Sequence, residues 1–154
     1  LQEQERFIPL REELEFIDSY LDIESVRFEQ RKLVIEKELD AAVLDTIIPS
    51  MIVQPLVENA IKHGISKRIE GGRIIIRAQG QNGIAVIEIE DNGNEHAQEA
   101  VQEQGLGIGL TNVSERLNVI YGDKGRLHLA RIPGRGTLAR LEIPDLEGSN
   151  LKVG

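Results

Sequence analysis

The sequence predicts an α+β fold of two layers, in which an antiparallel sheet is covered by helices on one side. The first indication is a long segment after Pro9 whose apolar residues recur at the spacing of a helix face. The second is a pair of strand-like runs, residues 73–80 and 84–91, joined by a short turn at Asn82 and Gly83, which indicates a hairpin. With 154 residues, the chain is long enough for one domain with a substantial core.

The elements of the first half are predicted from proline, glycine and apolar spacing. A helix is expected over Pro9–Gln30, because proline suits the first helical turn. Residues 33–39 (LVIEKEL) are expected to form a strand that ends at Asp40. A second helix is expected over about residues 54–63, with Gly64 ending it.

The second half continues with a loop, a helix and two closing strands. Residues 92–104 are polar and lack apolar periodicity, which favours a loop. A third helix is expected over residues 110–121, because its apolar residues fall on one face. Two strands, residues 125–131 and 137–143, are expected on either side of the PGRG turn at 133–136.

Composition favours a soluble, cytoplasmic protein that binds a small anion. The chain is 40% apolar and 29% charged, has no apolar run long enough to cross a bilayer, and starts without the apolar segment of a signal peptide. The lack of cysteine excludes disulfides, cysteine-ligated zinc and thiol chemistry. The net charge of −8 and an aromatic content of 3% argue against a nucleic-acid partner, although residues 61–77 and 116–140 are locally basic.

The segment VENAIKHG, residues 57–64, combines an amide with a carboxylate on a predicted helix. At helical spacing, Glu58, Asn59 and Lys62 share one side. For Glu58 and Lys62 taken alone, a salt-bridged exposed helix face is the favoured explanation. Asn59 is harder to explain in that way, because asparagine is a poor helix former and its side-chain oxygen suits magnesium beside phosphates.

The segment EDNG, residues 90–93, places a carboxylate at the end of a predicted strand. Asp91 could accept a hydrogen bond from an exocyclic amine such as that of adenine, and Gly93 would let the backbone approach the base. An ordinary turn that ends a strand explains the same residues, and the local pattern does not decide between the two hypotheses.

The segment GLGIGL, residues 105–110, is neither a dinucleotide fingerprint nor a Walker loop. It predicts a flexible loop that leads into the following helix, where free amides and the helix dipole favour phosphate. A plain hinge is the alternative, although ordering Gly105, Gly107 and Gly109 is unfavourable by roughly 0.5–1 kcal/mol each.

Together, these segments resemble the GHKL or Bergerat ATP-binding domain of sensor histidine kinases, gyrase-type topoisomerases, the Hsp90 chaperone and MutL repair proteins. The similarity is greatest to histidine kinases of the LytS/YehU type and extends from about Phe7 to Pro144. The matching motifs are residues 9–28 (PLREELEFIDSYLDIESVRF), 53–64 (VQPLVENAIKHG), 105–123 (GLGIGLTNVSERLNVIYGD) and 133–137 (PGRGT).

The resemblance implies a two-layer α/β sandwich with a mixed, mostly antiparallel sheet, which binds Mg-ATP and transfers its γ-phosphoryl group to a histidine. The resemblance implies that Asn59 is the magnesium ligand, that Glu58 is the carboxylate that polarises the reacting group, and that Lys62 and His63 lie at the phosphates. Asp91 and Gly93 would contact adenine, with Thr137 beside the adenine pocket. Gly105, Gly107 and Gly109 would form the hinge of an ATP lid that leads into Leu110, with Asn112 and Arg116 near the phosphates.

The resemblance also implies how the chain is organised and which partners it binds. A linker helix is expected over residues 1–30, the catalytic domain over 31–146 and a flexible tail over 147–154. The phosphoacceptor histidine, in an Asn-Pro-His-Phe type motif, is expected upstream of residue 1. The implied partners are this acceptor helix, a response regulator and a second copy in the full-length protein, which would be an inner-membrane sensor with this domain in the cytoplasm.

One departure keeps alternatives open. The family usually continues DNG with Pro-Gly, whereas Asn94 and Glu95 follow here. The alternative functions are those of a GHKL ATPase that works as a conformational clamp and of a nucleotide-binding module without phosphotransfer. The helix expected after Pro9, which matches the linker of the kinases, argues against the clamp.

Overall fold

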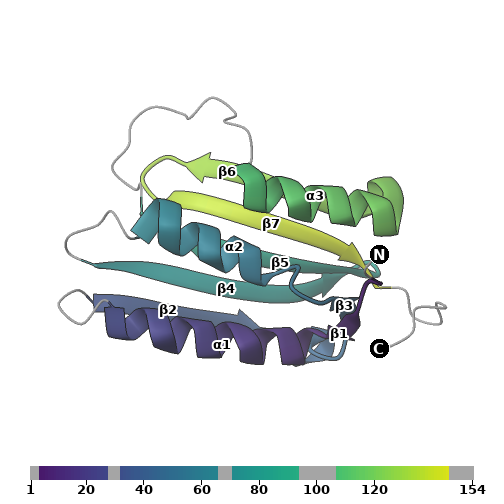
Figure 1. Cartoon of the computed structure of the whole chain (residues 1–154), viewed down its shortest axis with the longest axis horizontal. Helices are drawn as coiled ribbons and strands as arrows, with labels where there is room; N and C mark the ends of the chain where they lie inside the picture. The colour runs from purple at the N-terminus through teal and green to yellow at the C-terminus, as the bar shows by residue number, and fades with distance from the viewer. Residues whose placement is uncertain (1–3, 28–31, 66–70, 94–106, 146–154) are drawn as a thin grey trace.

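The chain folds into a sheet with a layer of helices on one side (Figure 1). The computed structural model describes residues 4–27, 32–65, 71–93 and 107–145. The elements are β1 (Phe7–Pro9), α1 (Leu10–Arg27), β2 (Lys32–Leu39), β3 (Ile47–Pro49), α2 (Gln54–Asn59), β4 (Gly71–Gln81), β5 (Ile84–Asp91), α3 (Gly107–Tyr121), β6 (Arg126–Ile132) and β7 (Gly136–Pro144). Short helical turns occupy Ala41–Val43, Ala60–Gly64 and Gly122–Lys124.

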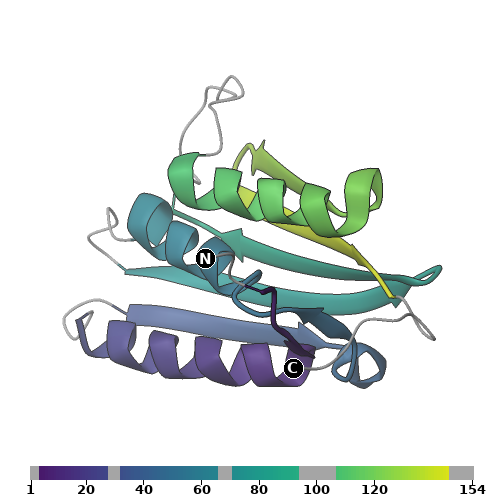
Figure 2. The same cartoon turned by 45° about the vertical axis from the view of Figure 1, so that its right-hand side comes forward.

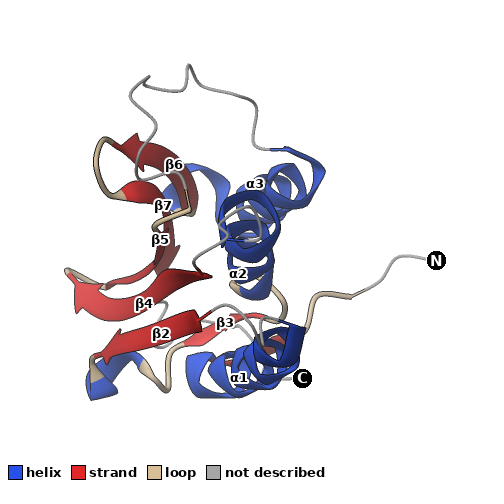
Figure 3. Cartoon of the chain, turned by 90° about the vertical axis from the view of Figure 1, so that its left-hand side faces the viewer, coloured by secondary structure: helices blue, strands red, loops and turns tan. Residues whose placement is uncertain are grey.

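The main sheet has five strands in the order β2-β4-β5-β7-β6. β2 pairs with β4 in parallel, and the other neighbouring strands are antiparallel. Helices α1, α2 and α3 cover one face of this sheet, and in Figure 3 no helix of the described residues covers the opposite face. The predicted α+β class, with a mixed and mostly antiparallel sheet, is confirmed.

One core joins the three helices to the sheet. The strands alternate, so that every second side chain points toward the helices. The fully buried core side chains include Leu10 and Ile17 of α1, Leu56 of α2, Leu110 and Leu117 of α3, and Ile74, Ile76, Ile87 and Ile89 of the central strands. α1 therefore packs on the same core as the segment that carries the predicted site.

The hairpin of β4 and β5 forms as predicted, because Asn82 and Gly83 take the positive φ angles of 50° and 77° that a tight turn needs. A second small sheet of β1 and β3 was not predicted. Each of these strands has only three residues, which is too short for alternation to be visible in the sequence.

Candidate functional site

Asp91 is a buried carboxylate at the end of the central strand β5. It is 5% exposed, and it lies opposite Thr137 of β7 in the antiparallel ladder. Its Oδ1 accepts a hydrogen bond from the N–H of Gly93 at 2.9 Å. Among the residues that the structure describes, none donates a hydrogen bond to Oδ2. Burial raises the pKa of Asp91 to about 6, against the opposing effect of the Gly93 hydrogen bond.

Gly64 packs closely against Asp91, and Gly93 packs closely against Gly64. A Cβ on Gly64 would lie 2.5 Å from Oδ1 of Asp91, and a Cβ on Gly93 would lie 2.3 Å from Cα of Gly64. Gly93 thus has the close backbone approach that the sequence suggested, but the approach is to Gly64. The two segments VENAIKHG and EDNG meet at this point.

The helical segment that starts at Gln54 ends at Gly64, as predicted, but Gly64 has no left-handed cap conformation. α2 is α-helical to Asn59 and continues through Ala60–Gly64 as a π-helical turn, after which Ile65 also has a right-handed helical backbone. The glycine at position 64 is explained by the Asp91 side chain beside it, and not by a left-handed cap. π-helical turns are rare and are often found at functional sites.

The polar residues of the asparagine segment (VENAIKHG, residues 57–64) lie on α2 and its π-helical turn. Glu58 and Asn59 are half-buried, and Lys62 and His63 are exposed. Oε1 of Glu58 accepts a hydrogen bond from Nε2 of Gln54 at 3.2 Å. Because residues 60–64 are π-helical, the spacing that placed Lys62 above Glu58 and Asn59 does not hold beyond Asn59.

α3 starts three residues earlier than predicted, at Gly107. The loop prediction was therefore wrong for Gly107 and Gly109, which lie in the first turn of the helix, whereas Gly105 lies outside the described residues. Burial of Leu110 in the core favours this extension, and the first four N–H groups of the helix lack helical partners. The side chain of Leu110 is thus unavailable to a ligand, and only its amide can contact one.

Asn112 is exposed on the next turn of α3. The start of this helix lies beside the asparagine segment, as the views in Figures 1 and 2 agree. Free amides at a helix N-terminus favour an anion. Lys62, His63, the start of α3 and Asp91 therefore belong to the same end of the molecule.

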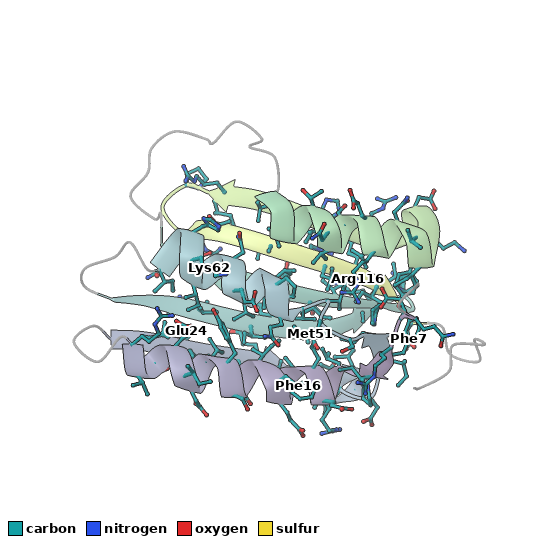
Figure 4. All side chains as sticks on the ribbon, in the orientation of Figure 1. Phe7, Phe16, Glu24, Met51, Lys62 and Arg116 are labelled. Atoms are coloured by element: carbon teal, nitrogen blue, oxygen red, sulfur yellow. The ribbon has the colours of Figure 1, made fainter. Side chains whose placement is uncertain are left out.

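Arg116 is not near this end, although the resemblance suggested it as a phosphate contact. Its guanidinium donates to both carboxylate oxygens of Glu5 at 2.8 Å, and to the carbonyl oxygens of Ser50 and Met51 at 2.7 and 2.9 Å. Figure 4 shows Arg116 and Lys62 toward opposite ends of the helical layer. Two turns of helix after Gly109 carry Arg116 away from the N-terminus of α3.

A cavity of about 160 Å³ lies on the helix-free side of the sheet and is lined by Arg73, Ile75, Glu90, Asp91, Asn92, Gly134 and Arg135. Glu90 and Asp91 are neighbours in a strand, so their side chains point to opposite faces. Glu90 pairs with Arg77 and Arg135, each at 3.0 Å. The arginine charges here are already balanced by carboxylates.

The donors at the helix-side site suit magnesium bound beside phosphates. In the described part of the chain, no three histidine, aspartate or glutamate side chains are placed to hold a metal ion together. Magnesium usually keeps several waters and takes only one or two protein oxygens plus substrate phosphates. The half-buried Asn59, next to Glu58 in the sequence, fits that pattern.

A comparison with protein families identifies the family of this chain. The family described as histidine kinase-, DNA gyrase B-, and HSP90-like ATPase matches residues 45–147, and a histidine kinase family matches residues 1–32. The chain belongs to the histidine kinase-, DNA gyrase B- and HSP90-like ATPase family.

The particular relatives are sensor proteins of bacteria. The chain is 35% identical to sensor histidine kinase BtsS of Escherichia coli K12, over 94% of this chain and 25% of that protein. It is 29% identical to sensor protein LytS of Bacillus anthracis, over 95% of this chain and 26% of that protein. The chain thus spans about a quarter of the length of these curated relatives.

Solved structures share the fold at low identity. The catalytic domain of histidine kinase ThkA, in a nucleotide-free form, has a TM-score of 0.67 at 16% identity, over 93% of this chain and 99% of that one. ThkA has also been solved in complex with response regulator protein TrrA, with a TM-score of 0.66 at 14% identity, over 95% of this chain and 43% of that one. In the described residues, no helix has the length and apolarity needed to cross a membrane.

Proposed function

We propose that this chain is the ATP-binding catalytic domain of a sensor histidine kinase, which transfers the γ-phosphoryl group of ATP to a histidine on an adjacent segment. The observation that carries the proposal is the buried Asp91 carboxylate, with one oxygen unpaired among the described residues, packed against Gly64 of the asparagine segment. The similarity to sensor histidine kinases over nearly the whole chain supports it.

Adenine would be recognised at Asp91. The ionised carboxylate can accept a hydrogen bond from the exocyclic amine through Oδ2, while Oδ1 stays bonded to Gly93. Thr137, which lies opposite Asp91 on β7, would lie beside the adenine. Gly93 would lie beneath the base, where the lack of a side chain would let the backbone approach it.

The phosphates would lie toward the asparagine segment and α3. Asn59 would hold a magnesium ion, which, when bound, supplies charge neutralisation for the transferred phosphoryl group. Lys62, His63 and the first amides of α3 would bind phosphate oxygens, with Asn112 one turn further on. Glu58 would polarise the reacting group, because it is the carboxylate next to Asn59.

The wider context is part of the same proposal. Residues 1–30 would be a linker helix after the acceptor segment, followed by the catalytic domain over 31–146 and a flexible tail over 147–154. The longer protein would act as a homodimer in the inner membrane, with this domain in the cytoplasm. It would pass phosphate to a response regulator, and the ThkA complex with TrrA supports that kind of partner.

Phosphotransfer to a separate acceptor tests this function. The chain is incubated with γ-labelled ATP and magnesium, alone and with the upstream histidine-bearing helix of the longer protein, and label is tested for the acid lability of phosphohistidine. We expect label only on the added helix, at a slow rate because the tethered reaction has become bimolecular. The variant Asn59→Ala serves as the control and should abolish the transfer.

Two results would contradict the proposal. Acid-labile label on His63, His96 or His128 of this chain would show a different acceptor. ATP binding without transfer to the supplied helix would favour a nucleotide-binding module.

A further inference from the structure

Glu13 is a charged residue in the middle of the core that the proposed function does not use. It lies on α1 and is 0% exposed. Its Oε1 accepts a hydrogen bond from the N–H of Met51 at 3.0 Å, and its Oε2 accepts from the N–H groups of Val53 and Gln54 at 2.9 and 3.1 Å. A buried carboxylate that satisfies three amides is a strong and directional contact.

These amides belong to the turn that starts α2. The residue before the helix, Val53, has an apolar side chain and makes no side-chain cap. The first N–H groups of a helix have no helical partners and attract negative charge. Glu13 therefore takes the place of a local cap, and it does so from a different helix.

The other side of the same turn is held by α3. Arg116 donates to the carbonyl oxygens of Ser50 and Met51, as described above. Met51 itself has a left-handed backbone, with a φ of 61°, which is unfavourable for a residue other than glycine. Figure 4 shows Met51 between α1 and Arg116 of α3. The turn is thus fixed in a strained conformation by one charged residue on each neighbouring helix.

We propose that Glu13 is a positioning residue for the nucleotide site, which links α1 to the start of α2 and thereby fixes where Asn59 lies. Asn59 is the last residue of the six-residue helix that starts at Gln54. Because this helix is so short, a displacement of its first turn also displaces Asn59. This inference rests on the proposed function for its effect on ATP, but the link between α1 and α2 is independent of it.

The experiment uses Glu13→Gln, which keeps the size of the side chain but turns one acceptor oxygen into a donor facing backbone N–H groups. Glu24→Gln is the matched control, because Glu24 is also buried on α1 but bonds to Arg27 of its own helix. Hydrogen exchange of the ligand-free chain is measured along α2 and α3, and calorimetry gives the affinities for ATP with and without magnesium.

We expect Glu13→Gln to increase exchange along α2 selectively, with α3 unchanged. It should weaken Mg-ATP binding about tenfold, the usual size for loss of a residue that orients a metal ligand, and should weaken metal-free ATP binding less. Glu24→Gln should behave like the wild type in both measurements. Selective exchange together with the magnesium-dependent loss distinguishes positioning from general stability.

Unchanged exchange in α2, or equal increases in α2 and α3, would overturn the inference. If Glu13→Gln is unfolded by circular dichroism, Glu13→Asp replaces it, because the shorter carboxylate keeps its charge but cannot reach all three amides. Unfolding of both variants would make Glu13 a residue of general stability and would also overturn the inference. If the wild type binds no ATP, the proposed function fails, and the exchange measurement alone decides the role of Glu13.

Discussion

Replacing Asp91 by asparagine should make the fold more stable and ATP binding weaker at the same time. The carboxylate is 5% exposed, and burial raises its pKa from 3.8 to about 6. Burial of the charged form therefore destabilises the folded state by about 3 kcal/mol at neutral pH, since each pKa unit corresponds to about 1.4 kcal/mol. Asparagine has no charge to bury and keeps an oxygen that can accept from Gly93.

The sign of the pH dependence follows from the direction of this shift. Between pH 3.8 and about 6, the folded state binds more protons at Asp91 than the unfolded state does. Its contribution to stability is thus lost as the pH rises through this window. The stability of Asp91→Asn minus that of the wild type should be near zero below this window and about 3 kcal/mol above it. Urea unfolding of both chains at several pH values measures this difference, because all other titrating groups are shared.

The effect on ATP has the opposite direction. Loss of a charge-assisted hydrogen bond, with a donor then facing the adenine amine, should weaken binding by about 2–3 kcal/mol, or roughly 30- to 150-fold. Wild-type affinity should also fall below about pH 6, as Asp91 becomes protonated, whereas the variant should lack this component. A stability difference that does not change with pH would refute the buried-charge argument, and an unchanged ATP affinity in calorimetry would refute the adenine contact.

Two other sets of variants test the metal and the glycine contacts. Asn59→Ala should weaken Mg-ATP binding far more than binding of metal-free ADP, because the side-chain oxygen is lost as a ligand; equal losses in calorimetry would make Asn59 merely structural. Gly93→Ala should lower the unfolding temperature, because its Cβ would lie 2.3 Å from Cα of Gly64. Gly109→Ala has no atom within 4 Å of the new Cβ and should instead stabilise α3, by up to about 1 kcal/mol. Calorimetric scans in which Gly93→Ala melts at a higher temperature than Gly109→Ala would contradict the close packing at Gly93.

Local patterns were enough to predict most of the fold. The hairpin at Asn82 and Gly83 was recognisable because its turn chemistry and its alternating strands are adjacent in sequence. The start of α3 was placed too late, because glycine is a poor helix former when judged by propensity alone. Burial of Leu110 in the core overrides that propensity, and burial by distant strands leaves no local signal.

Residues of the candidate site could be predicted where the functional side chains lie within one short sequence motif. Asp91 and Gly93 could be singled out from four adjacent letters, and the structure places Asp91 beside Gly64 and Thr137. Glu13 could not be found in this way. It contacts amides 38 to 41 residues further along the chain, and a carboxylate bonded to backbone has no partner side chain that a sequence pattern could indicate.

Titration of the isotope-labelled chain with Mg-ATP, followed by nuclear magnetic resonance of the backbone amides, tests the central claim most directly. Asp91 also lines the cavity beside Arg73 and Arg135, so the residues that distinguish the two locations are Gly64 and the start of α3 for the helix-side face, and Arg73 and Arg135 for the cavity. We predict that the largest shifts fall on Gly64, Gly93 and the first turn of α3. Shifts centred on Arg73 and Arg135, or no saturable shifts, would contradict the account.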